Sequence, residues 1–345
     1  MATQTPTRAS VEHSCKSDEN LASSRSVPRA KAPHYDRSAF AQAPLRVDTP
    51  SVRTILRLHR DFRVINSEQI ARLVPLSPDH LSHLLKTMWR NGLIDRPECQ
   101  KDYHQHGGGS KPKVTALSDH GARLLMELDG YEQAPRVNWS RKNRAIKRLF
   151  LAHHLLTAEF ATRTIASVDA GTELAIDHGY GQRQQLPNTG RRLDKPFKLP
   201  TTFFHDGRRH ITTLEPDWPF TLTTREPRRA HYLTEIDTGQ MPVVRANLHQ
   251  SSILKKLLGY DAIVKMKQHT KQLGWPTFRV PILTNSEERA HNILSAIPGT
   301  VRKELFWVSH LDAFLADDPL SHQWTDGNGK HQTLAPKHMR SPYTS

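Results

Sequence analysis

Cysteine is nearly absent from this chain of 345 residues, which holds only Cys15 and Cys99. The two lie far apart and form no Cys-x-x-Cys pair, so neither a disulfide scaffold nor a zinc knuckle is indicated. Long apolar runs are missing too: no stretch approaches the roughly 18 residues of a membrane span, and the N-terminus lacks the apolar core of a secretory signal. We therefore expect a reducing, cytoplasmic setting without membrane contact.

Several motifs of enzymatic chemistry are also absent. There is no Gly-x-x-x-x-Gly-Lys-Ser/Thr loop to hold ATP and no Gly-x-Ser-x-Gly elbow to carry a nucleophilic serine. A relaxase site, with a tyrosine beside three clustered histidines, is not visible. The pairs His104/His106 and His153/His154 are interpreted as chance composition rather than zinc sites, because adjacent helical histidines point to different faces and the first pair has no acid beside it.

Positive charge is the strongest compositional signal. The chain has 49 Lys and Arg against 34 Asp and Glu, a formal net charge of +15. Residues 1–45 hold six basic and four acidic residues, and residues 317–345 hold three of each, so the segment between them carries +13. We predict disordered tails at 1–48 and 317–345 and a polyanion as the partner of the folded part. A solvated basic surface without a ligand is the plainer alternative.

Residues 49–135 show the periodicity of several short helices and a hairpin. Apolar spacing and the capping residues Asn66 and Ser77 predict helices over 51–60, 68–74, 77–90 and 119–128. A glycine-rich loop at 107–113 separates two strand-like segments between the last two helices.

This order, with the runs LLKTMWRNGLIDR and KPKVTALSDHGARLL, resembles a winged helix-turn-helix domain. In such a fold the third helix enters the major groove of DNA and the wing follows phosphates. The resemblance implies base contacts from the third helix and phosphate contacts from the wing and from the cationic segment that follows it. The candidate DNA-binding residues are His83, Lys86, Thr87, Arg90, Lys111, Lys113, Arg141 and Lys142. A winged helix used only for protein contacts is the alternative.

Two strand-length segments of the C-terminal half carry acidic residues. LEPDWPFTL places Asp217 near the start of one segment, and HYLTEIDTG places Glu235 and Asp237 on one face of the other, because strand side chains alternate. If the strands are antiparallel neighbours, Asp217 lies opposite that pair. Three carboxylates on an apolar sheet require a cation, and Mg²⁺ is the simplest, since it takes oxygen ligands.

Residues 136–316 show the pattern of an α/β domain. The predicted elements are a helix over 146–166, strands over 173–180, 211–222 and 230–237, a helix over 246–273, a strand over 277–283 and a helix from 287. The first of these helices has a predicted buried stripe formed by Ile146, Leu149, Phe150, His153, Leu156, Phe160 and Ile165. Residues 181–209 are predicted to be a basic loop insertion.

This order, with Pro216-Asp217 and Glu235-Ile236-Asp237, resembles the restriction-endonuclease-like core and its PD-(D/E)XK signature. The lysine of that motif, which helps position or deprotonate the attacking water, is replaced by Asp237. Lys256 on the following helix is the expected substitute.

The whole series, including YLTEIDTG and KKLLGYDAI, resembles the replication-relaxation family of bacterial plasmids and mobile elements over about residues 50–285. Its members have an N-terminal winged helix, a Glu-Ile-Asp-x-Gly strand and a lysine followed four residues later by a tyrosine, here Lys256 and Tyr260. The resemblance implies an α+β chain with a winged helix-turn-helix before an α/β restriction-endonuclease-like domain.

Three functions remain as alternatives. The first is a DNA-binding accessory protein in plasmid or mobile-element replication, relaxation or mobilisation, with double-stranded DNA and replication or mobilisation proteins as partners and a homodimer left open. The second is a metal-dependent DNA nuclease. The third is a winged-helix transcriptional repressor.

The nuclease hypothesis assigns Mg²⁺ to Asp217, Glu235 and Asp237, with the metal activating a bound water. Lys256 steadies the phosphate, and Glu159 or Glu173 serves as an outer acid. The same acidic cluster also fits a salt-bridged scaffold that does not cut DNA. In that case its carboxylates pair with Arg229, Arg245 or Lys256.

Overall fold

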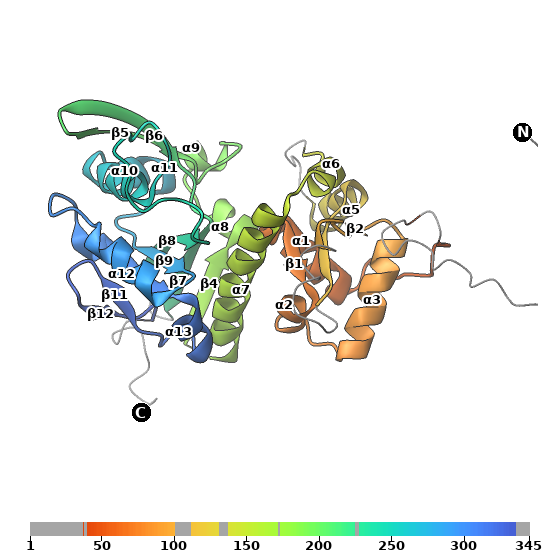
Figure 1. The fold of residues 1–345 in the computed structure, drawn as a ribbon. Helices are drawn as coiled ribbons and strands as arrows, with labels where there is room; N and C mark the ends of the chain where they lie inside the picture. The colour runs from red at the N-terminus through yellow and green to blue at the C-terminus, as the bar shows by residue number, and fades with distance from the viewer. Residues whose placement is uncertain are drawn as a thin grey trace, which may run out of the picture.

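The protein is a mixed α+β chain in which most neighbouring strands run antiparallel. The computed structural model describes residues 37, 40–100, 112–130, 137–171, 173–224 and 228–335. Figure 1 shows an N-terminal part and a larger C-terminal part, with one long helix between them. No helix among the described residues combines the length and the apolar character that crossing a bilayer requires.

The N-terminal part consists of short helices around a small sheet. Its elements are α1 (Pro50–Phe62), β1 (Val64–Asn66), α2 (Ser67–Ala71), α3 (Pro78–Arg90), β2 (Ile94–Asp95), β3 (Val114–Leu117), α5 (Asp119–Asp129) and α6 (Trp139–Arg144). β3 pairs antiparallel with both β1 and β2. The side chains of Asn66 and Ser77 accept hydrogen bonds from the first-turn amides of α2 and α3, so both predicted caps are confirmed.

Residues 40–48 pack against α3, which corrects the predicted disordered tail over this stretch. The ring of Phe40 meets Trp89 edge-on with 5.3 Å between ring centroids. The side-chain amide of Asn91 donates to the carbonyl of Ala43 at 2.8 Å. The apolar Phe40 therefore covers the C-terminal end of α3, a contact that the local composition does not reveal. The remainder of the predicted N-terminal tail lies outside the described residues, apart from Arg37.

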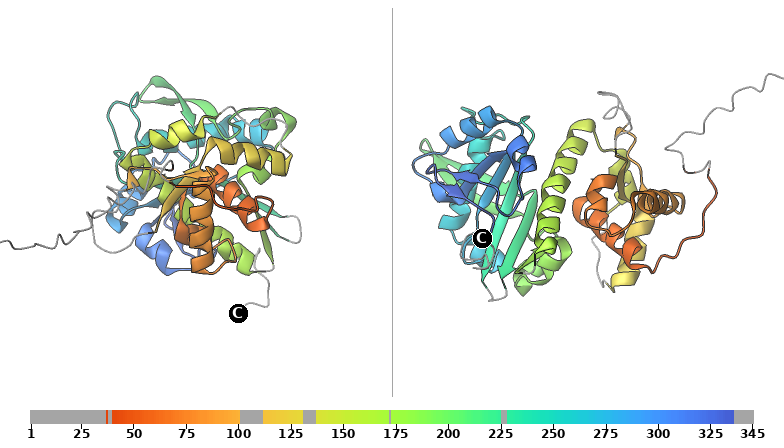
Figure 2. Two further views of the ribbon diagram at one scale, coloured as in Figure 1. Left: turned by 90° about the vertical axis from the view of Figure 1, so that its right-hand side faces the viewer. Right: turned by 90° about the horizontal axis from the view of Figure 1, so that it is seen from below.

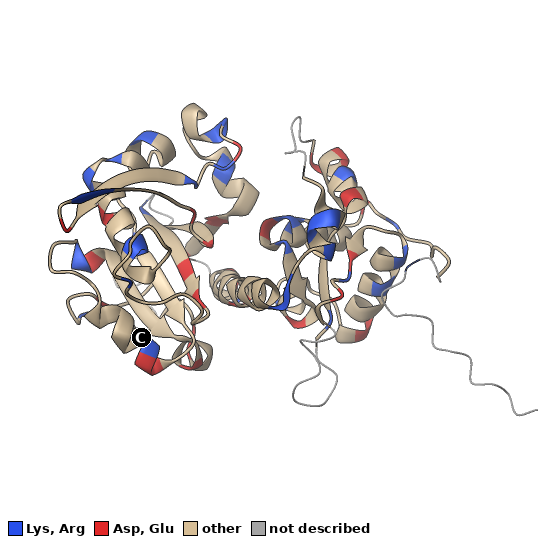
Figure 3. Ribbon diagram, turned by 45° about the horizontal axis from the view of Figure 1, so that its top comes forward, with Lys and Arg blue, Asp and Glu red and all other residues tan. Residues whose placement is uncertain are grey.

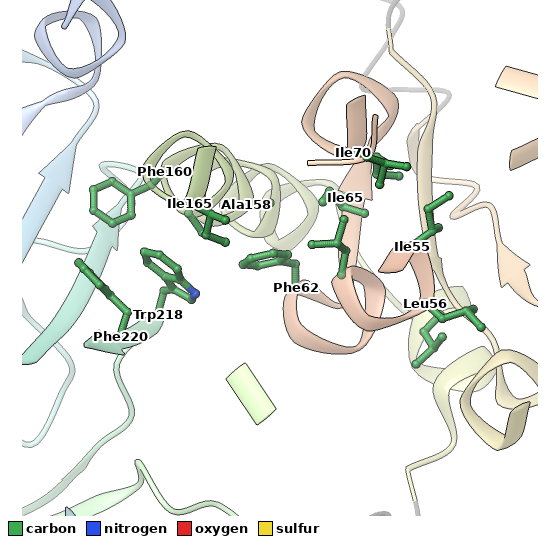
Figure 4. Packing of buried hydrophobic residues seen from close by; sticks show 14 of the residues in the cluster. Ile55, Leu56, Phe62, Ile65, Ile70, Ala158, Phe160, Ile165, Trp218 and Phe220 are labelled. Carbon is green, nitrogen blue, oxygen red and sulfur yellow. The ribbon is translucent and has the colours of Figure 1, made fainter. Parts of the chain in front are cut away.

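The long helix α7 (Arg148–Ala170) lies between the two parts (Figures 1 and 2). On one side Gln69 of α2 donates to the carbonyl of Leu155 at 2.9 Å. On the other side Phe160 lies edge-on to Trp218 at 5.7 Å between ring centroids. Figure 4 shows Phe62 among the side chains on the N-terminal side of this helix and Trp218 on the other. Buried side chains thus continue from one part into the other through α7.

The buried face of α7 differs from the predicted apolar stripe. Leu149 and Phe150, predicted to be buried, are 59% and 62% exposed. The helix begins at Arg148 and turns Leu151 and Leu155 inward instead. Leu151, in the same first turn, is fully buried beside Val64 and Val114, so this turn packs on one side and leaves Leu149 and Phe150 on its solvent side. Phe160 and Ile165 of the predicted stripe are buried as expected.

A seven-stranded sheet forms the centre of the C-terminal part. Its strands are β4 (Leu174–His178), β7 (Trp218–Thr224), β8 (Arg229–Asp237), β9 (Val280–Thr284), β10 (Phe306–His310), β11 (Trp324–Asp326) and β12 (His331–Gln332). They stand in the order β12-β11-β10-β9-β8-β7-β4. β8, β9 and β10 are parallel to one another, and the other neighbours are antiparallel.

Helices cover both faces of this sheet. They are α8 (Gly179–Gln184), α9 (Asn188–Arg191), α10 (Ile253–Lys265), α11 (Gln268–Leu273), α12 (Glu287–Ser295), α13 (Leu311–Ala316) and the short 3-10 helix η2 (Lys303–Leu305). α7 and α13 share one buried cluster with Trp218 and Phe220 of β7. α10 and α12 share a second cluster with β9 and β10.

Two predicted irregular segments are ordered. Residues 181–209, predicted to be a loop insertion, contain α9 and most of a hairpin formed by β5 (Leu199–His205) and β6 (Arg208–Leu214). The predicted tail from residue 317 contributes β11 and β12 at the sheet edge, where Trp324 and Leu334 are fully buried. These two residues reach a core formed by distant parts of the chain, which local polarity does not indicate.

Candidate functional site

The acidic site forms where β7 and β8 lie side by side. Trp218 is registered with Thr234, which brings Asp217 next to Glu235. The backbone amide of Asp217 donates to the carbonyl of Thr234 at 2.9 Å, and its carboxylate accepts the amide of Ile236 at 2.8 Å. The predicted antiparallel pairing, with Asp217 beside the acidic end of the second strand, is confirmed.

Asp217 pairs with a histidine from the long helix between the two parts. Nε2 of His153 on α7 lies 2.9 Å from Oδ1 of Asp217. Burial alone would lower the pKa of His153, but the hydrogen bond and charge of Asp217 outweigh it and raise that pKa. Burial likewise opposes ionisation of Asp217, yet His153 and Lys256 hold the pKa of this carboxyl below its ordinary value. The pair is therefore ionic at moderately acid pH.

Glu235 is bound by two residues of one helix face. Lys256 and Tyr260 stand four positions apart on α10, a spacing that stacks side chains on one face of a helix. The ammonium of Lys256 pairs with Oε2 of Glu235, and the hydroxyl of Tyr260 donates to Oε1 at 2.5 Å. Burial disfavours the charge of Lys256, but Glu235 and Asp217 outweigh burial and raise its pKa. The predicted proximity of Lys256 to the acidic pair is thus confirmed.

Asp237 has its own cation. It lies two residues beyond Glu235 on β8, and the guanidinium of Arg289 on α12 holds both of its carboxylate oxygens. The hydroxyl of Thr284 on the neighbouring strand also donates to Asp237 at 2.8 Å. These contacts make Asp237 part of the packing between β8 and α12, with a partner that the sequence did not indicate.

The expected arginine partners of the acidic cluster lie elsewhere. Arg229 stands at the start of β8, six residues before Glu235, which places it roughly 20 Å away along the strand. Arg245 instead donates to the carbonyl of Ser251 and to Gln250. Lys256 is the one predicted partner that pairs with the cluster.

Neither outer acid lies at the site. Glu159 is on α7 but faces the N-terminal part, where it pairs with Arg72 at 2.7 Å. Glu173 precedes Leu174, which is registered with Thr224 at the far end of β7. Both assignments are corrected, because helix phase and strand register direct these carboxylates away from Asp217.

The donor set has the hard oxygen ligands that Mg²⁺ prefers, at Asp217 and Glu235. In the described part of the chain, however, no group of three or more His, Cys, Asp or Glu side chains is placed to hold a metal ion. The three carboxylates have cations of their own, from His153, Lys256 and Arg289. The arrangement fits a charge-balanced cluster, and a metal would have to displace one of these partners.

The predicted DNA-reading face of α3 is partly covered. His83 and Lys86 are exposed, but Thr87 is only 5% exposed, and the guanidinium of Arg90 lies over the ring of Phe40 at 5.4 Å. The burial of Thr87 and the contact of Arg90 with Phe40 therefore remove both residues from the set of free base-reading side chains. This correction leaves the N-terminal half of the helix face open.

A basic cluster lies beside that open face. The guanidinium of Arg96 lies over the ring of Trp89 on α3 at 4.1 Å, and Arg96 follows Asp95, which is registered with Ala116 of β3. Lys113 directly precedes β3, and its pKa is lowered by burial and further by the charges of Arg96 and Lys86. Arg141 and Lys142 on α6 are also exposed. Figure 3 shows Lys and Arg recurring across the N-terminal part, on the right of the view. Lys111, the other predicted phosphate contact, lies outside the described residues.

Three residues of these sites were missed by sequence reasoning. His153 was assigned to the apolar stripe of its helix. A histidine among apolar residues was the signal that could have indicated a buried polar partner. Arg289 and Arg96 had no local signal, because their importance depends on the distant groups beside them.

The family model described as replication-relaxation matches residues 56–276. No curated protein matches the chain. Among solved structures, that of the SdaI restriction endonuclease is similar at 12% identity over 90% of this chain and 96% of that one, with a TM-score of 0.19. So low a TM-score carries no argument about the fold or the chemistry.

Proposed function

The chain belongs to the replication-relaxation family, and from this premise we propose that it is a DNA-binding accessory protein in plasmid or mobile-element replication, relaxation or mobilisation. The proposal takes the N-terminal part as a winged helix-turn-helix, with α3 as the helix that meets the DNA. The acidic cluster of the C-terminal part then serves as a buried scaffold.

The observation that supports this proposal is the basic edge beside α3, where Arg96 lies over Trp89 and Lys113 directly precedes the adjoining strand β3. Like charges held together repel one another, and a DNA phosphate backbone relieves that repulsion while releasing counterions. The cluster joins the open face of α3 to the strand that follows the glycine-rich loop. A helix beside a basic strand edge is the arrangement by which winged helices meet the major groove and adjacent phosphates.

The test is duplex binding by the Lys86→Ala/Lys113→Ala double variant, measured by fluorescence anisotropy at several salt concentrations. If both lysines contact phosphates, affinity falls for all sequences alike and the slope of log K against log salt becomes shallower by about 2. The control is Lys330→Ala, which removes one positive charge from an exposed lysine of the C-terminal part. It shows how much affinity is lost per cation when the lysine lies away from the proposed surface. Unchanged duplex affinity and salt slope in the double variant would refute this surface.

Recognition of the DNA bases is tested separately at His83, because this residue is the base-contact candidate of α3 that remains exposed. His83→Ala should reduce preference for the cognate site by about 1–3 kcal/mol without changing the salt slope.

A metal-dependent nuclease is the second candidate, favoured by the lysine that pairs with Glu235 beside Asp217. In this proposal Asp217 and Glu235 would hold Mg²⁺, which would supply an activated water, and Lys256 would pair with the phosphate in place of Glu235. Calorimetric titration of the full chain with Mg²⁺ and with Mn²⁺, with and without duplex DNA, tests the site. Binding that is lost in both Asp217→Ala and Glu235→Ala supports this candidate. No binding even with DNA present refutes it.

A further inference from the structure

The β5–β6 hairpin is a rigid two-stranded element at the upper left of Figure 1, on the side of the C-terminal part away from the N-terminal part. Its strands are joined by Asp206-Gly207, whose φ angles of 48° and 71° are both positive, as a tight type I′ turn requires. A two-residue turn fixes the register, so each side chain has a defined face.

The inner face of the hairpin anchors it to α10. Phe203 stacks on His210 with 5.3 Å between ring centroids, and Leu199 and Leu214 are buried. Gly259 of α10 allows a close approach, since a Cβ there would lie 3.0 Å from the side chain of Leu214. The hairpin is therefore held in place and needs no outer-face contact for its own stability.

The outer face is apolar and cationic. Phe204 is registered with Arg209, and Ile211 with Thr202, so the four side chains share one face and Phe204 is a diagonal neighbour of Ile211. Phe204 is 72% exposed and Ile211 69%, above the other large hydrophobic side chains of the described residues. Arg209 is exposed beside them. An aromatic ring left in water next to a guanidinium on an ordered strand gives no stability to the fold.

The charge around the hairpin indicates the kind of ligand. Residues 179–214 contain seven Lys or Arg and two Asp, and on the hairpin itself the exposed Arg208 and Arg209 outnumber Asp206. An anionic ligand with flat, apolar faces matches both features. Nucleic-acid bases stack on exposed aromatic side chains, but only unpaired bases offer their faces, because those of a duplex are already stacked.

We infer that the outer face of the β5–β6 hairpin binds single-stranded DNA, with an unpaired base stacked on Phe204 and the adjoining phosphate held by Arg209. Ile211 extends the apolar platform beside the ring. This site is separate from the α3 surface and extends the proposed DNA-binding function to unwound DNA. Single-strand binding by the hairpin and duplex binding by α3 can therefore be refuted independently.

The experiment measures binding of a labelled oligo-dT of about 12 nucleotides to the full chain by anisotropy. Phe204→Ala and Phe204→Leu should each weaken binding about 5- to 100-fold, the range expected for one stacked base, while Phe204→Tyr keeps the parent affinity. Phe204→Leu is decisive because it preserves an apolar side chain and removes the ring. Leu193→Ala, an exposed apolar residue outside the hairpin, is the matched control.

A 2-aminopurine base in the oligonucleotide reports stacking directly. Its fluorescence should be quenched by the parent and not by Phe204→Leu. Duplex affinity should be unchanged in the Phe204 variants and reduced in the Lys86/Lys113 variant, which separates this inference from the proposed α3 surface. Parent-like oligonucleotide binding by Phe204→Leu would overturn the inference. So would a dimer in sedimentation that Phe204→Ala/Ile211→Ala converts to monomer, since the face would then bind a second copy of the chain.

Discussion

At the scale of single residues, the acidic site is a set of separate pairs. Glu235 is held by Lys256 and Tyr260, while Asp217 is held by a histidine of a different helix. A buried carboxylate is tolerated only where its charge is balanced and its oxygens accept hydrogen bonds. The cluster therefore depends on its cations, whatever chemistry it performs.

Removing the cation of Glu235 should be costly. Lys256→Ala leaves that carboxylate buried and without its ion pair, and we expect a loss of about 3 kcal/mol in the free energy of unfolding. Urea denaturation measures it. Lys255 is the neighbour of Lys256 on α10, and its ammonium donates to the carbonyl of His249. Lys255→Ala should therefore lower the free energy of unfolding much less. Adding Glu235→Gln to Lys256→Ala should recover part of the loss; no recovery would contradict a charge effect.

The His153–Asp217 pair should make stability depend on pH. The pKa of His153 is raised above its ordinary 6.5, so its stabilisation is complete below about pH 6.5 and is lost as pH rises through the raised value. The pKa of Asp217 is lowered below 3.8, so its contribution is present above about pH 3.8 and is lost as pH falls through the lowered value. In thermal unfolding, the midpoint of His153→Gln should lie further below that of the parent at about pH 5.5 than at about pH 9. An equal loss at both values would show that pairing does not depend on the charge of His153.

At the scale of elements, α7 serves as a core helix for both parts of the chain. Its side chains meet α2 on one side and the sheet on the other, so it is buried along most of its length. Phe160 and Ile165 of the predicted stripe are buried, and the prediction was wrong only at its start, where Leu149 and Phe150 are exposed. A helix that packs on two sides lacks the single apolar stripe from which phase is normally read.

The packing of α7 can be tested with two phenylalanines on the same helix. Phe160 is fully buried and contacts the aromatic rings of Trp218, Phe314 and Trp324, so Phe160→Ala should lower the free energy of unfolding by about 4 kcal/mol. Phe150 is 62% exposed, and Phe150→Ala should change stability by less than about 0.5 kcal/mol. Chemical denaturation of both variants gives the comparison, and similar losses would contradict this helix phase.

At the scale of the whole molecule, one continuous buried cluster joins the two parts. Phe62 at the end of α1 lies 6.5 Å from Trp218 between ring centroids, and Phe160 continues the cluster from the other side (Figure 4). The N-terminal part is thus joined by packed side chains to the sheet that carries the acidic site and, through α10, to the hairpin.

This continuity predicts a single unfolding transition. Thermal melts followed by far-UV circular dichroism and by tryptophan fluorescence should coincide, because tryptophans lie in both parts and report a shared core. Phe62→Ala should lower the midpoint of both signals together, while the exposed Val244→Ala should leave it in place. Two separate transitions, with Phe62→Ala shifting only one, would show that the parts unfold independently.

The sequence by itself determined the features that local chemistry controls. Asn66 and Ser77 cap helices because their side chains satisfy amides only three residues away. Strand alternation placed Glu235 and Asp237 on one face of β8, and the four-residue spacing of Lys256 and Tyr260 puts both on one face of α10. Their joint contact with Glu235 was not predicted and is a finding of the structure. The family itself was recognisable from the order of these motifs.

Only the tertiary structure decided which groups meet across long separations. His153 is 64 residues from Asp217, and Arg289 is 52 residues from Asp237, so neither pair has a local signature. The contact of Arg90 with Phe40, and the burial of Thr87 and Trp324, likewise depend on surfaces that exist only after distant elements pack. A buried charge or apolar group requires a partner, and its identity is settled by packing, because the requirement is for proximity in space rather than along the chain.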